Sequence, residues 1–132
     1  MRPPKKAPLT RDLQALAVLF ATSGTVHLLR PQVFEAIVPR VLPARRGIVY
    51  ASGIGELACA AGLLHPATRK GAGWASAALL VLIFPANMQM AATEGRRASR
   101  GTGSRGRHVA ALIRLPLQIP LIRTALRAAG RL

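Results

Sequence analysis

Residues 47–64 read GIVYASGIGELACAAGLL, and this stretch decides the fold class. Apart from Glu56, it holds only apolar, small or weakly polar side chains, on every face of a helix. At about 1.5 Å per residue, a helix of this length approaches the roughly 30 Å thickness of a bilayer's hydrocarbon core. A helix on the surface of a soluble protein would instead show one apolar stripe and a charged opposite face. The stretch therefore predicts a membrane-spanning helix.

The rest of the chain repeats this pattern. The four predicted spans cover residues 13–29, 47–64, 71–92 and 109–126. Pro66 ends the second span, and Arg69 and Lys70 begin the third, so the turn is short and these two helices are antiparallel neighbours. A chain of 132 residues is long enough for one domain, residues 1–132. We therefore expect an all-α fold, an integral membrane up-and-down four-helix bundle.

The two longer connections differ in what they could bury. Residues 31–43 carry apolar side chains at helical spacing between prolines, which predicts a short broken helix in the headgroup plane that caps one end of the bundle. These apolar residues are Val33, Phe34, Ile37, Val38, Val41 and Leu42. Residues 94–107 read EGRRASRGTGSRGR and contain nothing apolar to bury, which predicts a mobile basic loop.

The N-terminal residues 1–22 have the basic start and apolar run of a secretory signal. However, Asp12 opens the run, and Ser23 and His27 continue it without a small-x-small cleavage site. We expect this segment to be retained as the first span.

The composition is bimodal: 51% of the residues are hydrophobic, yet the formal net charge is +15, from 19 Lys and Arg against 4 Asp and Glu. Such an excess would suit the phosphates of nucleic acid. However, the cations lie in the gaps between apolar runs, as in multispanning proteins, and no aromatic or arginine stripe could stack bases. We therefore expect the chain to have a lipid bilayer, and no nucleic acid, as its partner. Both ends of the bundle carry similar numbers of cations, so orientation stays open, with a slight preference for cytoplasmic termini.

Metal and thiol chemistry find little support in the sequence. The single cysteine, Cys59, lies among alanines in an apolar run, so an internal disulfide or dithiol motif is impossible. An apolar setting also disfavours the reactive thiolate. The three histidines, His27, His65 and His108, fall at different depths, so no two could share a metal or haem. We expect no metal site.

Strongly polar side chains inside the spans are the best candidates for a functional site, because such groups are costly in hydrocarbon and usually face the bundle interior. They are Ser23, His27, Ser52, Glu56, Asn87, Gln89, Arg114 and Gln118. Alternating helix directions and the lean of side chains toward each helix's N-terminus bring the larger ones to similar depths. We expect His27, Glu56, Asn87, Arg114 and Gln118 to form an intramembrane polar layer that is the candidate ligand-binding site, with no catalytic residue assigned.

Three interpretations of this layer stay open. Pro85 and Pro116 each remove a backbone N–H, so nearby polar groups could simply tie kinked helices together. The layer could instead form a ligand pocket, or support proton or redox chemistry. In each case the cost of a buried charge predicts that Arg114, the only deep cation, pairs with Glu56, the only deep acid, while His27 or Asn87 completes the hydrogen bonds.

Four segments carry a resemblance to a known family. They are SGTVHLLRPQVFEAIVPRVLP (23–43), SGIGELACAAGLLHPATR (52–69), FPANMQMA (84–91) and RLPLQIPLI (114–122). In content, order and spacing they resemble the DoxX-like four-helix membrane proteins of bacteria. The resemblance implies a multi-pass four-helix bundle in the bacterial cytoplasmic membrane. The family name comes from a subunit of a quinone-reducing thiosulfate oxidoreductase, and some members are associated with thiol and oxidative-stress proteins, whereas this chain lacks a thiol pair.

From residues and resemblance together, we expect a non-catalytic membrane subunit or a binder of a small lipophilic molecule such as a quinone, and no other cofactor. One alternative is a membrane component of a redox complex, an oxidoreductase or oxidative-stress assembly with a protein partner. Another is a membrane assembly factor or scaffold. An enzyme acting alone is less favoured. The distinguishing feature is a cavity, because a binder needs an apolar pocket with a few polar groups, whereas a scaffold needs only packed helices.

Overall fold

The computed structural model describes residues 8–38 and 40–131, and all the regular structure in these ranges is helical. The helices are α1 (Arg11–Leu29), α2 (Pro31–Glu35), α3 (Arg45–Leu64), α4 (Arg69–Ser99) and α5 (Arg105–Ala128). Four of them, all but α2, are long and apolar enough to cross a membrane by length and composition. The predicted all-α architecture with four long apolar helices is confirmed, and each helix contains its predicted span.

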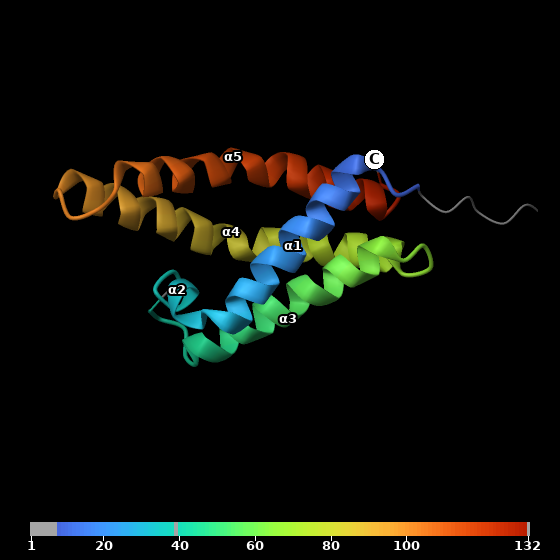
Figure 1. Cartoon of the computed structure of the whole chain (residues 1–132), viewed down its shortest axis with the longest axis horizontal. Helices are drawn as coiled ribbons and strands as arrows, with labels where there is room; N and C mark the ends of the chain where they lie inside the picture. The colour runs from blue at the N-terminus through green and yellow to red at the C-terminus, as the bar shows by residue number, and fades with distance from the viewer. Residues whose placement is uncertain (1–7, 39, 132) are drawn as a thin grey trace, which may run out of the picture.

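The long helices form two pairs. Helices α4 and α5 make a long antiparallel hairpin, α1 packs along α3, and α3 leads directly into α4 (Figure 1). The two pairs separate toward the end where α2 lies (Figure 1). At the opposite end α1 crosses α4 and reaches α5, which closes the bundle there. We call the end where α1 meets α5 the closed end of the bundle, and toward the other end the two pairs diverge (Figure 1).

The core lies in the closed half, away from α2. Its largest fully buried side chains include Leu16 and Phe20 of α1 and Leu63 of α3, and Leu80 of α4 joins the same cluster. Small residues supply the rest, such as Ala125 of α5. Small side chains let helix backbones approach closely, which is how helices pack when the surroundings are themselves apolar.

A buried arginine holds the turn between α3 and α4. Arg69, the first residue of α4, is buried and donates from Nε to the carbonyl of Leu63 at 2.7 Å and from Nη2 to that of Leu64 at 3.0 Å. The last carbonyls of a helix lack partners within the helix and carry partial negative charge. The guanidinium therefore caps α3, and the turn cation expected from the sequence has a structural role.

The connection between α4 and α5 is shorter than the basic loop expected at residues 94–107. Helix α4 continues to Ser99 and α5 begins at Arg105, which leaves only residues 100–104. The turn is closed by Thr102 N–H donating to the Arg97 carbonyl at 3.0 Å and by Gly101 in the left-handed region at φ 71°. The sequence expectation was wrong here because a polar segment was read as a loop, although arginine, alanine and glutamate favour helices.

The connection between α1 and α3 is helical only at its start. Helix α2 covers Pro31–Glu35, and Val38 beyond it is buried. Proline at the first position suits a helix start, because its missing N–H would have no partner there. The predicted break at Pro39 and the basic start at residues 1–7 lie outside the described residues.

Candidate functional site

The most buried charged residue inside a predicted span is Glu56, and its partner is a histidine. Glu56 of α3 is 3% exposed. Its Oε2 lies 3.5 Å from Nδ1 of His27 on α1, which is also buried. The same His27 nitrogen lies 2.7 Å from the Ser23 carbonyl oxygen and 3.5 Å from the Ser23 hydroxyl. Within the described residues, Glu56 Oε2 makes this contact with His27 but no hydrogen bond.

Two glycines bring these side chains together. A Cβ on Gly53 would lie 2.7 Å from the His27 Cβ and 3.0 Å from the Gly24 carbonyl oxygen. A Cβ on Gly24 would lie 2.7 Å from the Gly53 carbonyl oxygen and 3.2 Å from the Glu56 Cβ. Any side chain at either position would therefore push the helices apart. His27 and Glu56 each follow their glycine by one turn, so the crossing of α1 and α3 positions the pair.

Helix α2 covers the histidine. The Phe34 ring stacks on the His27 imidazole with centroids 3.6 Å apart and planes 15° apart. Glu35 ties α2 to α3, because its Oε1 accepts from Arg46 Nε at 2.5 Å. Helix α2, the start of the segment expected to cap one end of the bundle, thus packs on His27 and is tied to α3.

Arg114 is not the partner of Glu56, and the prediction of that ion pair was wrong. The Arg114 side chain is exposed, and its Nη1 approaches the Met90 sulfur of α4 at 3.6 Å. The depths of the two residues were estimated along the membrane normal, but that estimate carries no information about lateral position. Helix α5 packs on α4 and touches α1, so Arg114 lies away from the crossing of α1 and α3.

Asn87 and Gln118 form a second polar pair, between α4 and α5. Asn87 Nδ2 donates to Gln118 Oε1 at 3.1 Å, and the buried Gln118 donates through Nε2 to the Leu80 carbonyl. Pro85 interrupts the α4 hydrogen-bond ladder just beyond Leu80. This pair therefore joins α4 and α5 near Pro85. The five predicted site residues divide into His27 with Glu56, Asn87 with Gln118, and a separate Arg114.

A groove adjoins Gln118. Its volume is about 280 Å³. Its lining is Val81, Phe84, Leu115, Gln118, Ile119 and Ile122. Only Gln118 in this set is polar, so the groove is apolar with one amide. The sequence pointed to Gln118 but not to the aliphatic lining, because an apolar residue facing a groove has the same pattern as one facing lipid.

A second groove lies at the closed end, where α1 begins. Its volume is about 330 Å³. Its lining is Asp12, Ile119, Pro120, Arg123, Thr124 and Arg127. Sequence reasoning missed this site, since Arg123 and Arg127 read only as flanking cations. Their spacing of four residues, which puts them on one helix face, was the available signal.

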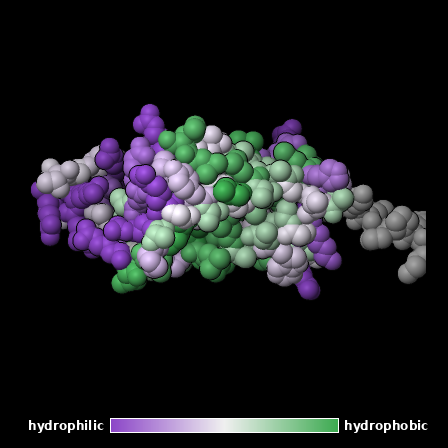
Figure 2. All heavy atoms as spheres, turned by 90° about the horizontal axis from the view of Figure 1, so that it is seen from below, coloured by the Kyte–Doolittle hydropathy of each residue, from purple (hydrophilic) through white to green (hydrophobic). Residues whose placement is uncertain are grey.

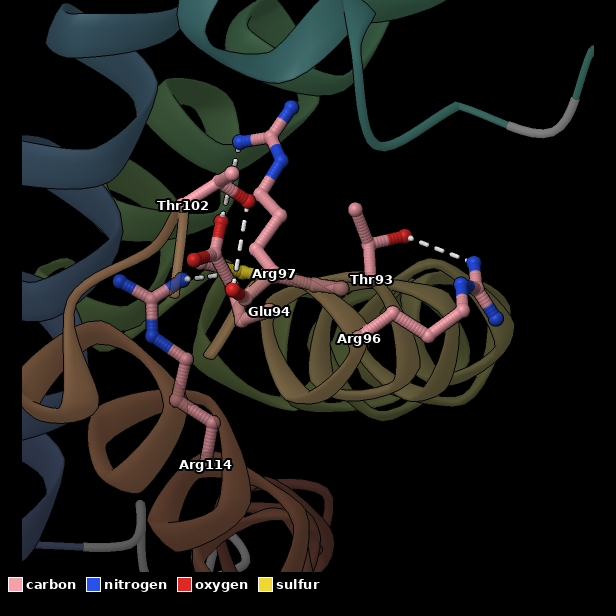
Figure 3. A network of polar contacts seen from close by, with 7 residues as sticks. Thr93, Glu94, Arg96, Arg97, Thr102 and Arg114 are labelled. Atoms are coloured by element: carbon pink, nitrogen blue, oxygen red, sulfur yellow. Dashed lines mark hydrogen bonds and ion pairs between the residues drawn. The ribbon is translucent and has the colours of Figure 1, made fainter. Parts of the chain in front are cut away.

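The tip of the α4–α5 hairpin holds a further polar network. Arg97 Nη1 lies 3.5 Å from Glu94 Oε1, and the Arg97 carbonyl accepts from the Thr102 hydroxyl at 3.3 Å, while Arg114 reaches from α5 toward α4 (Figure 3). Glu94 is buried, and its Oε2 accepts no hydrogen bond from the part of the chain that the structure describes. His108 of α5 packs on Gly95 of α4. These contacts join the two helices at the turn and assign no ligand.

Within residues 8–38 and 40–131, no group of three His, Cys, Asp or Glu side chains is arranged to hold a metal. His65 lies at the end of α3, where its Nδ1 accepts from the Ala67 N–H at 3.2 Å. Cys59 is buried as a free thiol in the core.

The described part of the chain is thus a helical fold with four long apolar helices, in which His27 with Glu56 and Asn87 with Gln118 join neighbouring helices and two grooves lie along α5. Residues 16–129 match the family DUF8561, a domain of unknown function, and the chain belongs to this family. The match runs from the second turn of α1 to the end of α5, so it covers both pairs and nearly all of both grooves. No curated protein and no solved structure matches the chain.

Proposed function

We propose that the chain is a multi-pass protein of the bacterial cytoplasmic membrane, DoxX-like in its build, that binds a small lipophilic molecule such as a quinone in the α4–α5 groove. It acts as a non-catalytic membrane subunit. The observation that carries the proposal is the groove itself, apolar throughout except for the buried amide of Gln118.

The outer surface supports the membrane location. Large apolar side chains point outward from every long helix, among them Val18 at 65%, Leu82 at 75% and Ile119 at 65% exposure. Figure 2 shows hydrophobic residues over the middle of the molecule and hydrophilic residues gathered toward its ends. A soluble monomer rarely exposes so continuous an apolar surface, whereas a bilayer covers it.

Gln118 can still hold a ligand while it ties the hairpin. A side-chain amide has two donors and an oxygen with two lone pairs. In the structure one donor goes to the Leu80 carbonyl and one lone pair takes the Asn87 donor. One donor and one lone pair therefore remain for a carbonyl or hydroxyl oxygen, the groups that a quinone or quinol presents. Apolar walls with one oriented polar group are typical of small-molecule sites.

Filling the groove tests this proposal. The purified protein in mild detergent is titrated with a short-chain quinone, and binding is measured by equilibrium dialysis. We expect Ile122→Trp to weaken binding at least tenfold, because the indole would occupy the groove. Ile113→Trp is the matched control, since Ile113 is an exposed α5 residue outside the groove lining. Equal affinity for both variants would contradict a site in this groove.

A scaffold or assembly role is the second candidate, and the packing around Glu56 favours it. The Gly24–Gly53 contact fills the space beside Glu56, and neither groove reaches that residue. A membrane component of a redox complex would use the same packed helices together with a protein partner. Crosslinking in native membranes, followed by mass spectrometry of the attached proteins, distinguishes these roles. A stable protein partner with no quinone binding would favour the scaffold.

A further inference from the structure

The second groove is cationic at one end and apolar at the other. Arg123 and Arg127 lie one turn apart on α5, whereas Ile119 and Pro120 line the part nearer the middle of the helix. Two arginine side chains one turn apart on a helix can bind the same anion. The groove therefore offers charge at the end of the helix and hydrocarbon contact farther in.

The groove keeps a net positive charge although the carboxylate of Asp12 lines it. Its Oδ2 lies 3.2 Å from Arg127 Nη1 and 3.5 Å from the Thr124 hydroxyl, and Oδ1 accepts from the Thr10 hydroxyl. The carboxylate thus offsets Arg127 and fixes α1 against α5. In the described part of the chain no hydrogen bond or ion pair joins Arg123 to another side chain, so its charge is available to a ligand.

The two grooves are neighbours. Ile119 lines both of them, the apolar α4–α5 groove as well as the cationic one. A molecule that occupies both would place its polar group beside Arg123 and its hydrocarbon beyond Ile119. A neutral quinone would form no ion pair with the arginines.

We propose that the natural ligand of the α4–α5 groove is an anionic amphiphile, a phosphate ester carrying hydrocarbon, with its phosphate on Arg123 and Arg127. This inference rests on the proposed function, since it uses the same groove. Guanidinium groups bind phosphate oxygens through paired hydrogen bonds, which an ammonium cannot reproduce. The phosphate is the shared chemistry of a lipid headgroup and of free phosphate, and the hydrocarbon contact favours the lipid.

Native mass spectrometry of the detergent-solubilised protein tests the inference. The probes are a phosphatidate, a diacylglycerol with the same acyl chains, and inorganic phosphate. We expect phosphatidate to bind at least about fivefold more tightly than diacylglycerol, since one arginine near a lipid surface contributes about 1 kcal/mol. Arg123→Gln should remove most of this preference and still fold, because the side chain is exposed. Arg105→Gln makes an equal charge change at the other end of α5 and should leave the preference for phosphatidate unchanged.

The outcomes separate the two proposals. If Ile122→Trp weakens both lipids but the wild-type protein binds them equally, the anionic head is wrong while the groove stands. If neither lipid responds to Ile122→Trp, the proposed binding function fails and the inference fails with it. If inorganic phosphate displaces phosphatidate at comparable concentration, the site is a phosphate site and the lipid assignment is overturned. Preference for phosphatidate that depends on both Arg123 and Ile122 supports the inference.

Discussion

At the scale of single residues, the buried carboxylate of Glu56 faces an imidazole rather than a guanidinium. Sequence reasoning identified the costly residue and included His27 in its surroundings, but it assigned the neutralising role to Arg114. The reason is physical: the cost of burying a carboxylate requires some partner, and depth along a helix does not select among partners at similar depth. The packing of α1 on α3, closest at Gly24 and Gly53, places α1 and not α5 against Glu56.

The first prediction concerns this pair. In a double-mutant cycle on Glu56→Gln and His27→Gln, read as thermal stability in detergent, we expect a coupling of about 0.5–3 kcal/mol, the range for residues in contact. The corresponding cycle on Glu56→Gln and Arg114→Gln serves as the control and should be additive, since Arg114 reaches Met90 instead. Coupling in the second cycle but not the first would restore the original pairing.

The second prediction concerns the crossing itself. Gly53→Ala should destabilise the protein by about 1–3 kcal/mol, because the added methyl meets the His27 Cβ and the Gly24 carbonyl oxygen and the helices must separate. Gly71→Ala is the matched control within a helix: a Cβ there meets no atom within 4 Å, and alanine favours helix over glycine. The midpoint of thermal unfolding should fall for the first variant only. A Gly53→Ala protein as stable as wild type would mean that the helices are not in contact at this point.

At the scale of elements, the four long helices could be predicted because the evidence for each lies within its own stretch of sequence. Each needs only a long apolar run, which the sequence displays without reference to any other part of the chain. The difference at the α4–α5 connection has another cause. The end of α4 and the beginning of α5 are polar and were read as a loop, although arginine, alanine and glutamate favour helices. The contacts that hold α2, such as Phe34 on His27 and Glu35 with Arg46, lie between elements and are not visible in a local pattern.

The same reasoning explains the candidate site. Gln118 and Asn87 were recognised as polar residues within apolar runs, and a role in tying the helices together was among the interpretations considered. The grooves were not predicted, because they depend on how α4, α5 and the start of α1 meet. Arg123 is an example. It lines a groove because Asp12, which lies more than a hundred residues away in sequence, is close to it in space.

The third prediction concerns the α4–α5 hairpin. Gln118→Leu should cost about 1–3 kcal/mol, because it leaves the Leu80 carbonyl and the Asn87 amide without their partner near a proline. Gln89→Leu is the control on α4, since Gln89 makes no side-chain hydrogen bond among the described residues. Hydrogen exchange should report the loss as faster exchange in α4 around Pro85. Unchanged exchange there would show that the hairpin is held by packing alone.

At the scale of the whole molecule, helix lengths and the distribution of charge fit a bilayer. Helix α4 has 31 residues, about 46 Å at 1.5 Å per residue, which exceeds the roughly 30 Å of a hydrocarbon core. The excess lies at its arginine-rich end, so the tip of the α4–α5 hairpin would project into the aqueous phase. In such a bilayer the hairpin tip and α2 would lie on one side, and the turn between α3 and α4 would lie on the other.

The last prediction is this topology. In a Cys59→Ala background, which removes the only native thiol, single cysteines replace Ala67 in the turn between α3 and α4 or Thr102 in the hairpin turn. Both positions are exposed. Because one helix separates them, a membrane-impermeant maleimide added to intact cells should label one and not the other, and permeabilisation should expose both. Which one is labelled reports the orientation that the balanced cations leave open. Labelling of both in intact cells, or a monomer that stays soluble without detergent, would contradict a four-span protein, because α4 must cross the bilayer for the two turns to face opposite compartments.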